Sequence, residues 1–269
     1  MWYYRHRLRE DRQSEGLLDE VEPESGFDAF SGPQEEDNNG LSWTAQKVLS
    51  LDSFFLKKVF LFEQDTRKVK ELETLKTDFE NREKQRGNPL IQIFQGDSNE
   101  MVRKIFQQEE NTLGVKQAVL ALLNQRTSEC SWELVEYLST LKPTNEGGTK
   151  VEIFYFLAQG WIDRALKSRK LDDKIQETAA WYRGDDWNKF LDLSIEERPI
   201  HFCGKFHELG YKYARSYGMR AGDGRIMFWL IHATDHMRAP KIMERAYSTI
   251  CQGLTDDEWK EEVQEDFWE

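Results

Sequence analysis

Two short apolar runs in this chain each end near an acidic residue, and an amphipathic helix pattern lies between them. The first run, residues 59–62, is followed by Glu63, and the second run, residues 90–94, is followed shortly by Asp97. Residues 66–86 carry apolar side chains at helical spacing, namely Val69, Leu72, Leu75 and Phe79. Because open α/β sheets bind ligands at the carboxyl ends of their strands, both acids are predicted to lie at that edge.

The alternation of strand and helix patterns continues along the chain. Further strands are predicted at residues 117–123, 151–157 and 226–232, and further helices at residues 44–51, 99–108, 132–141, 239–251 and 256–267. Continuously apolar strands are typical of parallel sheets that are covered on both faces. The pattern therefore predicts an α/β, Rossmann-like and mostly parallel sheet with right-handed crossovers.

The alternation is absent from two regions, and these suggest the domain organisation. Residues 1–26 carry a run of arginines followed by a run of acids, which indicates a charged N-terminal arm. Residues 162–225 contain helical patterns and no convincing strand, which predicts a helical insertion. The α/β domain would then comprise residues 27–161 and 226–269.

Composition limits the classes of protein. The chain has 269 residues, 39% of them hydrophobic, and a net charge of −12. Such a charge disfavours non-specific nucleic-acid binding, although a local basic groove is still compatible with it. No apolar run approaches the roughly 18 residues that span a bilayer, and the N-terminus lacks the apolar core of a signal peptide. Three scattered cysteines, Cys130, Cys203 and Cys251, fit a reducing compartment, so a cytoplasmic location is expected.

The acids at the two strand ends suggest a nucleoside ligand. A carboxylate at Glu63 can accept hydrogen bonds from both ribose hydroxyls, and Asp97 or Ser98 can face an adenine edge. Each also has a purely structural interpretation, since Glu63 can cap the following helix and Asp97 or Ser98 can serve as an N-cap. Taken together, the pair favours a nucleoside cofactor, with S-adenosylmethionine (SAM) as the leading candidate.

The segment before these strands offers a further cofactor contact. Residues 27–30 are predicted to form a first strand, and Gly32 lies in the turn that follows it. Such a turn lets backbone amides approach the charged tail of a cofactor. An ordinary loop is the competing interpretation, because only one glycine is present and three acids follow at residues 35–37.

The end of the strand at residues 117–123 is where group-transfer chemistry is expected. Asn124 and Gln125 follow this strand, and an asparagine amide can hydrogen-bond a substrate but cannot act as a general base. Cys130 lies nearby and is either a thiolate nucleophile or a buried structural cysteine. Asn124 and Gln125 are therefore the candidate catalytic residues.

Two clusters could suggest a metal, but neither has a convincing ligand set. His232, Asp235 and His236 follow a predicted strand and resemble a strand-end turn rather than a helical metal motif. Cys203 and His207 stand four residues apart and supply only two ligands for zinc. No metal site is therefore predicted. A metal-dependent hydrolase or nuclease that uses the histidine cluster is kept as the weakest alternative.

Read in order, these segments resemble the three-Cys-motif partner family, whose members are similar to class I SAM-dependent methyltransferases. The segments that carry the resemblance are residues 27–33, 60–63, 96–99, 122–127, 152–157, 160–161 and 231–236. The resemblance implies a seven-stranded SAM-methyltransferase-type sheet, and a partner protein that is radical-SAM-like and carries the three cysteines. It places the SAM tail near Asp28 and Gly32, the ribose on Glu63, and adenine near Asp97 and Ser98.

Two positions depart from the family pattern and leave two main hypotheses. Gln34 stands where the family has glycine, and Asn124 stands where it has aspartate. The first hypothesis is a SAM-dependent methyltransferase, with the acceptor beside Asn124. The second is a non-catalytic interaction subunit on a degenerate methyltransferase scaffold, which works with a partner protein.

Overall fold

The structure is a computed structural model, which describes the chain in a series of ranges. These are residues 25–28, 44–49, 56–82, 90–108, 113–115, 117–125, 129–142, 144, 148–167, 181–183, 187–220 and 224–249. Three sequence predictions lie outside the described residues: all but the last two positions of the charged arm at 1–26, the turn with Gly32, and the helix at 256–267. Within the described residues, no helix has the length and apolar character needed to cross a membrane.

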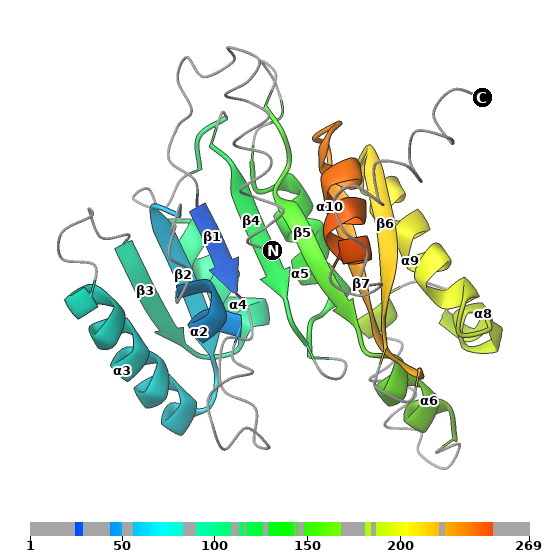
Figure 1. Cartoon of the computed structure of the whole chain (residues 1–269), viewed down its shortest axis with the longest axis horizontal. Coiled ribbons are helices and arrows are strands. Elements are labelled where there is room, and N and C mark those ends of the chain that lie inside the picture. The colour runs from blue at the N-terminus through cyan, green and yellow to red at the C-terminus, as the bar shows by residue number, and fades with distance from the viewer. Residues whose placement is uncertain are drawn as a thin grey trace.

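The described strands form one mixed sheet (Figure 1). They are β1 (Ser25–Asp28), β2 (Lys58–Glu63), β3 (Leu90–Gln95), β4 (Val119–Leu123), β5 (Glu152–Leu157), β6 (Tyr213–Arg220) and β7 (Ile226–Thr234). The order across the sheet is β3-β2-β1-β4-β5-β7-β6. Strands β1 to β5 pair in parallel, and β7 runs antiparallel to both of its neighbours. The predicted α/β, mostly parallel sheet is confirmed.

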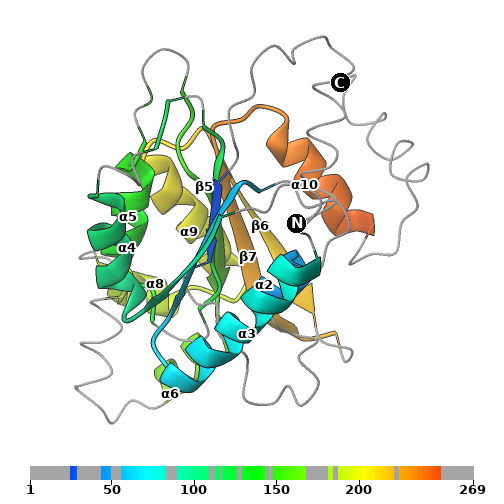
Figure 2. The same cartoon turned by 90° about the vertical axis from the view of Figure 1, so that its left-hand side faces the viewer.

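Two layers of helices sandwich this sheet, as Figure 2 shows edge-on. On one face lie α2 (Thr44–Leu49), α3 (Thr66–Arg82) and α10 (Ala239–Tyr247). On the other face lie α4 (Ser98–Phe106), α5 (Trp132–Thr140), α8 (Trp187–Asp192) and α9 (Glu197–Glu208). The central strand β4 is buried along its whole length, as its sequence VLALL requires of a strand covered on both faces.

An aromatic cluster fills the space between α9 and the sheet. Phe202, on α9, has no solvent-exposed surface. Its ring centroid lies between 5.2 and 6.0 Å from those of five other aromatic residues, Trp132, Tyr155, Trp181, Tyr182 and Phe190. These partners come from α5, β5 and the segments that precede α9, so Phe202 joins the helical region to the sheet.

The helical insertion predicted for residues 162–225 is only partly correct. The region contains α8, α9 and most of α6 (Gln159–Lys167), as expected, but residues 213–220 form the strand β6. This strand pairs with β7 alone and ends the sheet. Its sequence, YARSYGMR, carries two arginines and a serine because an edge strand is half exposed. Because polar residues interrupt it, this strand shows no continuous apolar run in the sequence.

Candidate functional site

The chain changes direction across the sheet between β1 and β4. From β1 it builds outward through β2 and β3, and it then returns to place β4 on the other side of β1. The last residue of β1, Asp28, is level with Leu61 of β2 and with Leu122 of β4. In open α/β sheets a ligand crevice forms at such a reversal, outside the carboxyl ends of the strands. The carboxyl ends of β1 to β4 are therefore the candidate site.

Glu63 ends β2 at this edge and is half buried. One of its carboxylate oxygens, Oε1, accepts a hydrogen bond of 2.9 Å from the backbone N–H of Asp65, before α3 begins. The other oxygen, Oε2, makes no hydrogen bond within the described part of the chain. The turn thus fixes the orientation of the carboxylate and leaves one acceptor oxygen for a ligand.

The turn after β3 brings Asp97 to the same edge. Gly96 donates its backbone N–H to the carbonyl oxygen of Glu63 at 3.0 Å, which holds this turn against the end of β2. Asp97 is the N-cap of α4, and its Oδ1 accepts from the backbone N–H of Asn99 at 2.9 Å. The capping interpretation of Asp97 is confirmed. Ser98 begins the helix and is buried, while Asp97 is exposed.

Asn99 connects this turn to the next strand end, a role that the sequence analysis missed. Its Nδ2 donates to Asp97 Oδ1 at 2.9 Å and to the carbonyl oxygen of Glu129 at 2.7 Å. Its Oδ1 accepts from the backbone N–H of Ser131, the N-cap of α5, at 2.9 Å. One amide side chain therefore aligns the starts of α4 and α5. An asparagine two residues after an N-cap aspartate gave no sequence signal for contacts 30 residues away.

The two candidate catalytic residues after β4 point to different surroundings. Asn124 donates from Nδ2 to the hydroxyl of Thr44 at 3.1 Å, where α2 begins. Gln125 is only 3% exposed; its Nε2 donates to the carbonyl oxygen of Phe156 at 3.1 Å, and its Oε1 accepts from the backbone N–H of Cys130 at 2.9 Å. Gln125 therefore connects β5 to the loop that follows β4 through these two hydrogen bonds. Both ends of its amide are engaged within the fold, which argues for a structural role and leaves Asn124 as the candidate at this edge.

Cys130 is a buried structural cysteine. Burial raises the pKa of its thiol far above the usual value, and the negative charges of Asp97 and Glu129 raise the pKa further. The thiolate form that a nucleophile needs is therefore scarce.

We expect native Cys130 to resist alkylation. At pH 8, iodoacetamide should modify it at least about 100-fold more slowly than in the urea-unfolded chain, because only the accessible thiolate reacts. Peptide mapping by mass spectrometry measures the rate at each cysteine separately. Cys203 is an internal comparison, because burial raises its pKa to about 11. Equal labelling rates of Cys130 in the native and unfolded chains would contradict the assignment.

The histidine cluster lies away from this site and does not form a metal centre. Because β7 is antiparallel to β5, Asp235 and His236 lie beyond the amino end of β5, at the opposite edge of the sheet. The buried His232 contacts Glu152 at 2.7 Å, while Asp235 accepts backbone N–H groups from Lys150 and Lys212. Within the described ranges no three potential ligands are grouped closely enough to hold a metal ion. The alternative of a metal-dependent hydrolase or nuclease therefore loses its ligand set.

Comparison with known proteins finds solved structures of similar fold but no match in sequence. The sequence matches no protein-family model and no curated protein. Among solved structures, M. jannaschii TYW2 in complex with AdoMet matches at a TM-score of 0.38 and 10% identity over 84% of this chain and 74% of that one. The methyltransferase domain of bacterial CtHen1 matches at a TM-score of 0.39 and 10% identity over 82% and 94%. The citrinin polyketide synthase CMeT domain matches at 0.41 and 11% over 87% and 52%.

Proposed function

We propose that this protein is a SAM-binding, methyltransferase-like protein whose cofactor lies across the carboxyl ends of β1 to β3. The observation that supports this most directly is Glu63, whose carboxylate is fixed on one oxygen by the backbone of Asp65. Its second oxygen is available to accept hydrogen bonds from a ribose diol, as the acidic residue does in dinucleotide sites. A seven-stranded, mostly parallel sheet is also what the resemblance to class I methyltransferases implies.

The remaining contacts follow from the same edge. Asp97 is exposed in the turn between β3 and α4, next to the end of β2. As the N-cap residue it fixes the start of α4, beside the predicted adenine position. Asp28 and Gly32 are proposed to contact the charged tail of the cofactor. Bound SAM would supply an activated methyl group, so the protein's task is to align the acceptor with it.

Asn124 is proposed to orient the methyl acceptor. Its Nδ2 is held by Thr44 at 3.1 Å, so its carbonyl oxygen is positioned to accept a hydrogen bond from a substrate N–H or O–H. An amide cannot take up a proton at neutral pH. The acceptor is therefore expected to be a nucleophile that needs no general base from this residue, such as an unprotonated nitrogen.

Calorimetric titration tests the proposal. SAM and S-adenosylhomocysteine are each titrated into the purified protein, and we expect a single site with a micromolar Kd. A parallel melting curve establishes that the protein is folded. A cooperatively melting protein that releases no binding heat with either ligand, and gains no thermal stability from them, would refute the proposed function.

A non-catalytic interaction subunit is the second candidate. The engagement of both ends of the Gln125 amide within the fold favours it, because it withdraws one of the two candidate catalytic residues from the site. A radical-SAM-like partner that carries three cysteines, as in the three-Cys-motif partner family, would then be the protein it serves. Normal biological function in a Glu63→Ala/Asp97→Ala double variant would support this candidate, while loss of function with normal folding would count against it.

A further inference from the structure

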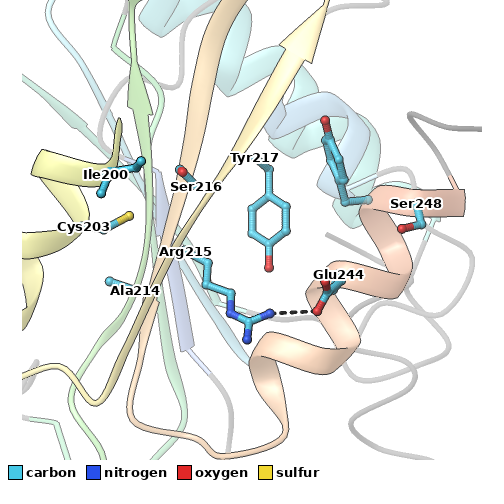
Figure 3. A pocket seen from close by; sticks show the side chains of 9 residues that line it. Ile200, Cys203, Ala214, Arg215, Ser216, Tyr217, Glu244 and Ser248 are labelled. Atoms are coloured by element: carbon cyan, nitrogen blue, oxygen red, sulfur yellow. Dashed lines mark hydrogen bonds and ion pairs between the residues drawn. The ribbon is translucent and has the colours of Figure 1, made fainter. Parts of the chain in front are cut away.

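A cavity follows the free edge of the sheet, far from the candidate cofactor site. It has a volume of about 620 Å³ and lies between α9 and α10 beside β6 (Figure 3). Four consecutive residues of the strand, 214–217, line it, together with five helical positions, Ile200, Cys203, Glu244, Tyr247 and Ser248. Because the lining includes residues from both faces of one strand, the cavity wraps around the edge of β6 rather than covering one face of the sheet.

The edge itself has backbone groups available for pairing. β6 is the last strand in the sheet, and no other described segment pairs with its outer side. The Tyr247 hydroxyl donates to the Gly218 carbonyl oxygen at 2.8 Å, and a register shift follows between Met219 and Arg220. These features close the far end of the edge, so the open stretch is residues 213–217. Without these features, an edge strand of eight residues that contains no proline could pair along its whole length with strands of other chains.

The two walls of the cavity differ in chemistry. On the α9 side, the strand residues Ala214 and Ser216 face Cys203 and the 68% exposed Ile200. This wall is small and mainly apolar. On the α10 side, Arg215 forms an ion pair of 2.8 Å with Glu244, which leaves this wall without net charge (Figure 3).

Tyr217 adds a hydrogen-bonding group to the wall on the α10 side. Its ring lies 5.2 Å from that of Tyr247, and the residue is only 6% exposed. Among the residues that the structure describes, its hydroxyl has no hydrogen-bond partner. Buried polar groups are normally paired, so an unpaired hydroxyl beside a cavity is a marker for a missing partner group.

We propose that the β6 edge is a docking site for one extended peptide segment of a partner protein, which adds a strand to the sheet. Main-chain hydrogen bonds to residues 213–217 would supply affinity, and side chains that alternate between the two walls would supply specificity. The α9 wall suits a small apolar side chain. The α10 wall suits an uncharged hydrogen-bonding side chain, because either sign of charge would meet Arg215 or Glu244. This inference does not depend on cofactor binding.

The shape of the cavity favours a peptide over a second copy of this chain. The β6 edge lies between α9 and α10. A single extended peptide has no flanking helices, so it can approach this edge without meeting them. A second copy would bring its own α9 and α10 with its β6, so that helices would meet helices on both faces. The net charge of −12 on each chain would oppose that approach as well.

A designed peptide tests the site. The probe is a capped peptide of alternating valine and threonine with lysines at both ends, and the control peptide has the same composition with its valines grouped together. We expect the alternating peptide to bind and to slow amide hydrogen exchange in residues 213–217. Ile200→Asp should weaken binding about tenfold. Met237→Asp, at a 75% exposed position outside the cavity, should leave binding unchanged.

Three outcomes would overturn the proposal. They are equal binding of both peptides, binding without slower exchange in β6, and no binding by a protein that melts normally. Sedimentation of the free protein adds a further outcome, since a dimer that Ile200→Asp dissociates would assign the edge to a second copy instead.

Discussion

Replacing Glu63 with alanine is expected to weaken S-adenosylhomocysteine binding by tenfold to about 100-fold. The carboxylate would lose a charge-assisted hydrogen bond to the ribose, and one such bond contributes about 1.5–3 kcal/mol. Calorimetric titration of the variant and the parent protein gives both dissociation constants. The stability of the folded state should change little. Within the described residues, this side chain accepts one hydrogen bond, of 2.9 Å, from the backbone N–H of Asp65.

Glu71→Ala is the matched control. Glu71 lies exposed on α3, and its replacement removes the same charge from the same region without touching the strand end. The control variant should bind as the parent protein does. If Glu63→Ala and Glu71→Ala bind alike while the parent protein binds with micromolar affinity, the nucleoside lies elsewhere. In that case the carboxylate at the end of β2 serves only the turn into α3.

Replacing Phe202 with alanine is expected to lower the free energy of unfolding by about 3–5 kcal/mol, the usual cost of removing a fully buried phenylalanine. The side chain is 0% exposed, and five aromatic partners surround it within 6.0 Å. For a chain of this size each kcal/mol lowers Tm by about 2–4 °C, so a fall on the order of 10 °C is expected. Urea unfolding followed by circular dichroism measures the free energy directly.

Ile200→Ala is the comparison for this experiment. The residue lies two positions earlier on the same helix and is 68% exposed. Its replacement should change the unfolding free energy by no more than about 0.5 kcal/mol, as is usual at the surface. A loss below about 1 kcal/mol for Phe202→Ala would show that α9 is not held to the sheet through this aromatic cluster.

Most of the sheet could be predicted from the sequence because its central strands are buried on both faces. In β2 and β4 nearly every side chain packs into the core, so the strands are visible as continuous apolar runs. The helix α3 is amphipathic, and its apolar spacing marks its buried face. β6 lacks both signals, because an edge strand with Arg215 at its surface carries neither a continuous run nor a helical period.

The site was harder to predict because ligand contacts and structural contacts use the same residue types. Asp97 was expected either as an N-cap or as an adenine contact, and the structure shows that it caps α4 while it also lies at the carboxyl edge. The direction of an amide side chain leaves no trace in the sequence. Asn124 and Gln125 are adjacent, yet only Gln125 turns inward to the carbonyl oxygen of Phe156.

The order of the last two strands also determines how the chain can be built during synthesis. β6 is made before β7, yet β7 occupies the place next to β5 and is the strand to which β6 pairs. The nascent β6 therefore has no place in the sheet until residues 226–234 have left the ribosome. A chain that ends just before Ile226 would contain the residues of β6 but lack the strand with which they pair, and it would leave the side of β5 that β7 covers open.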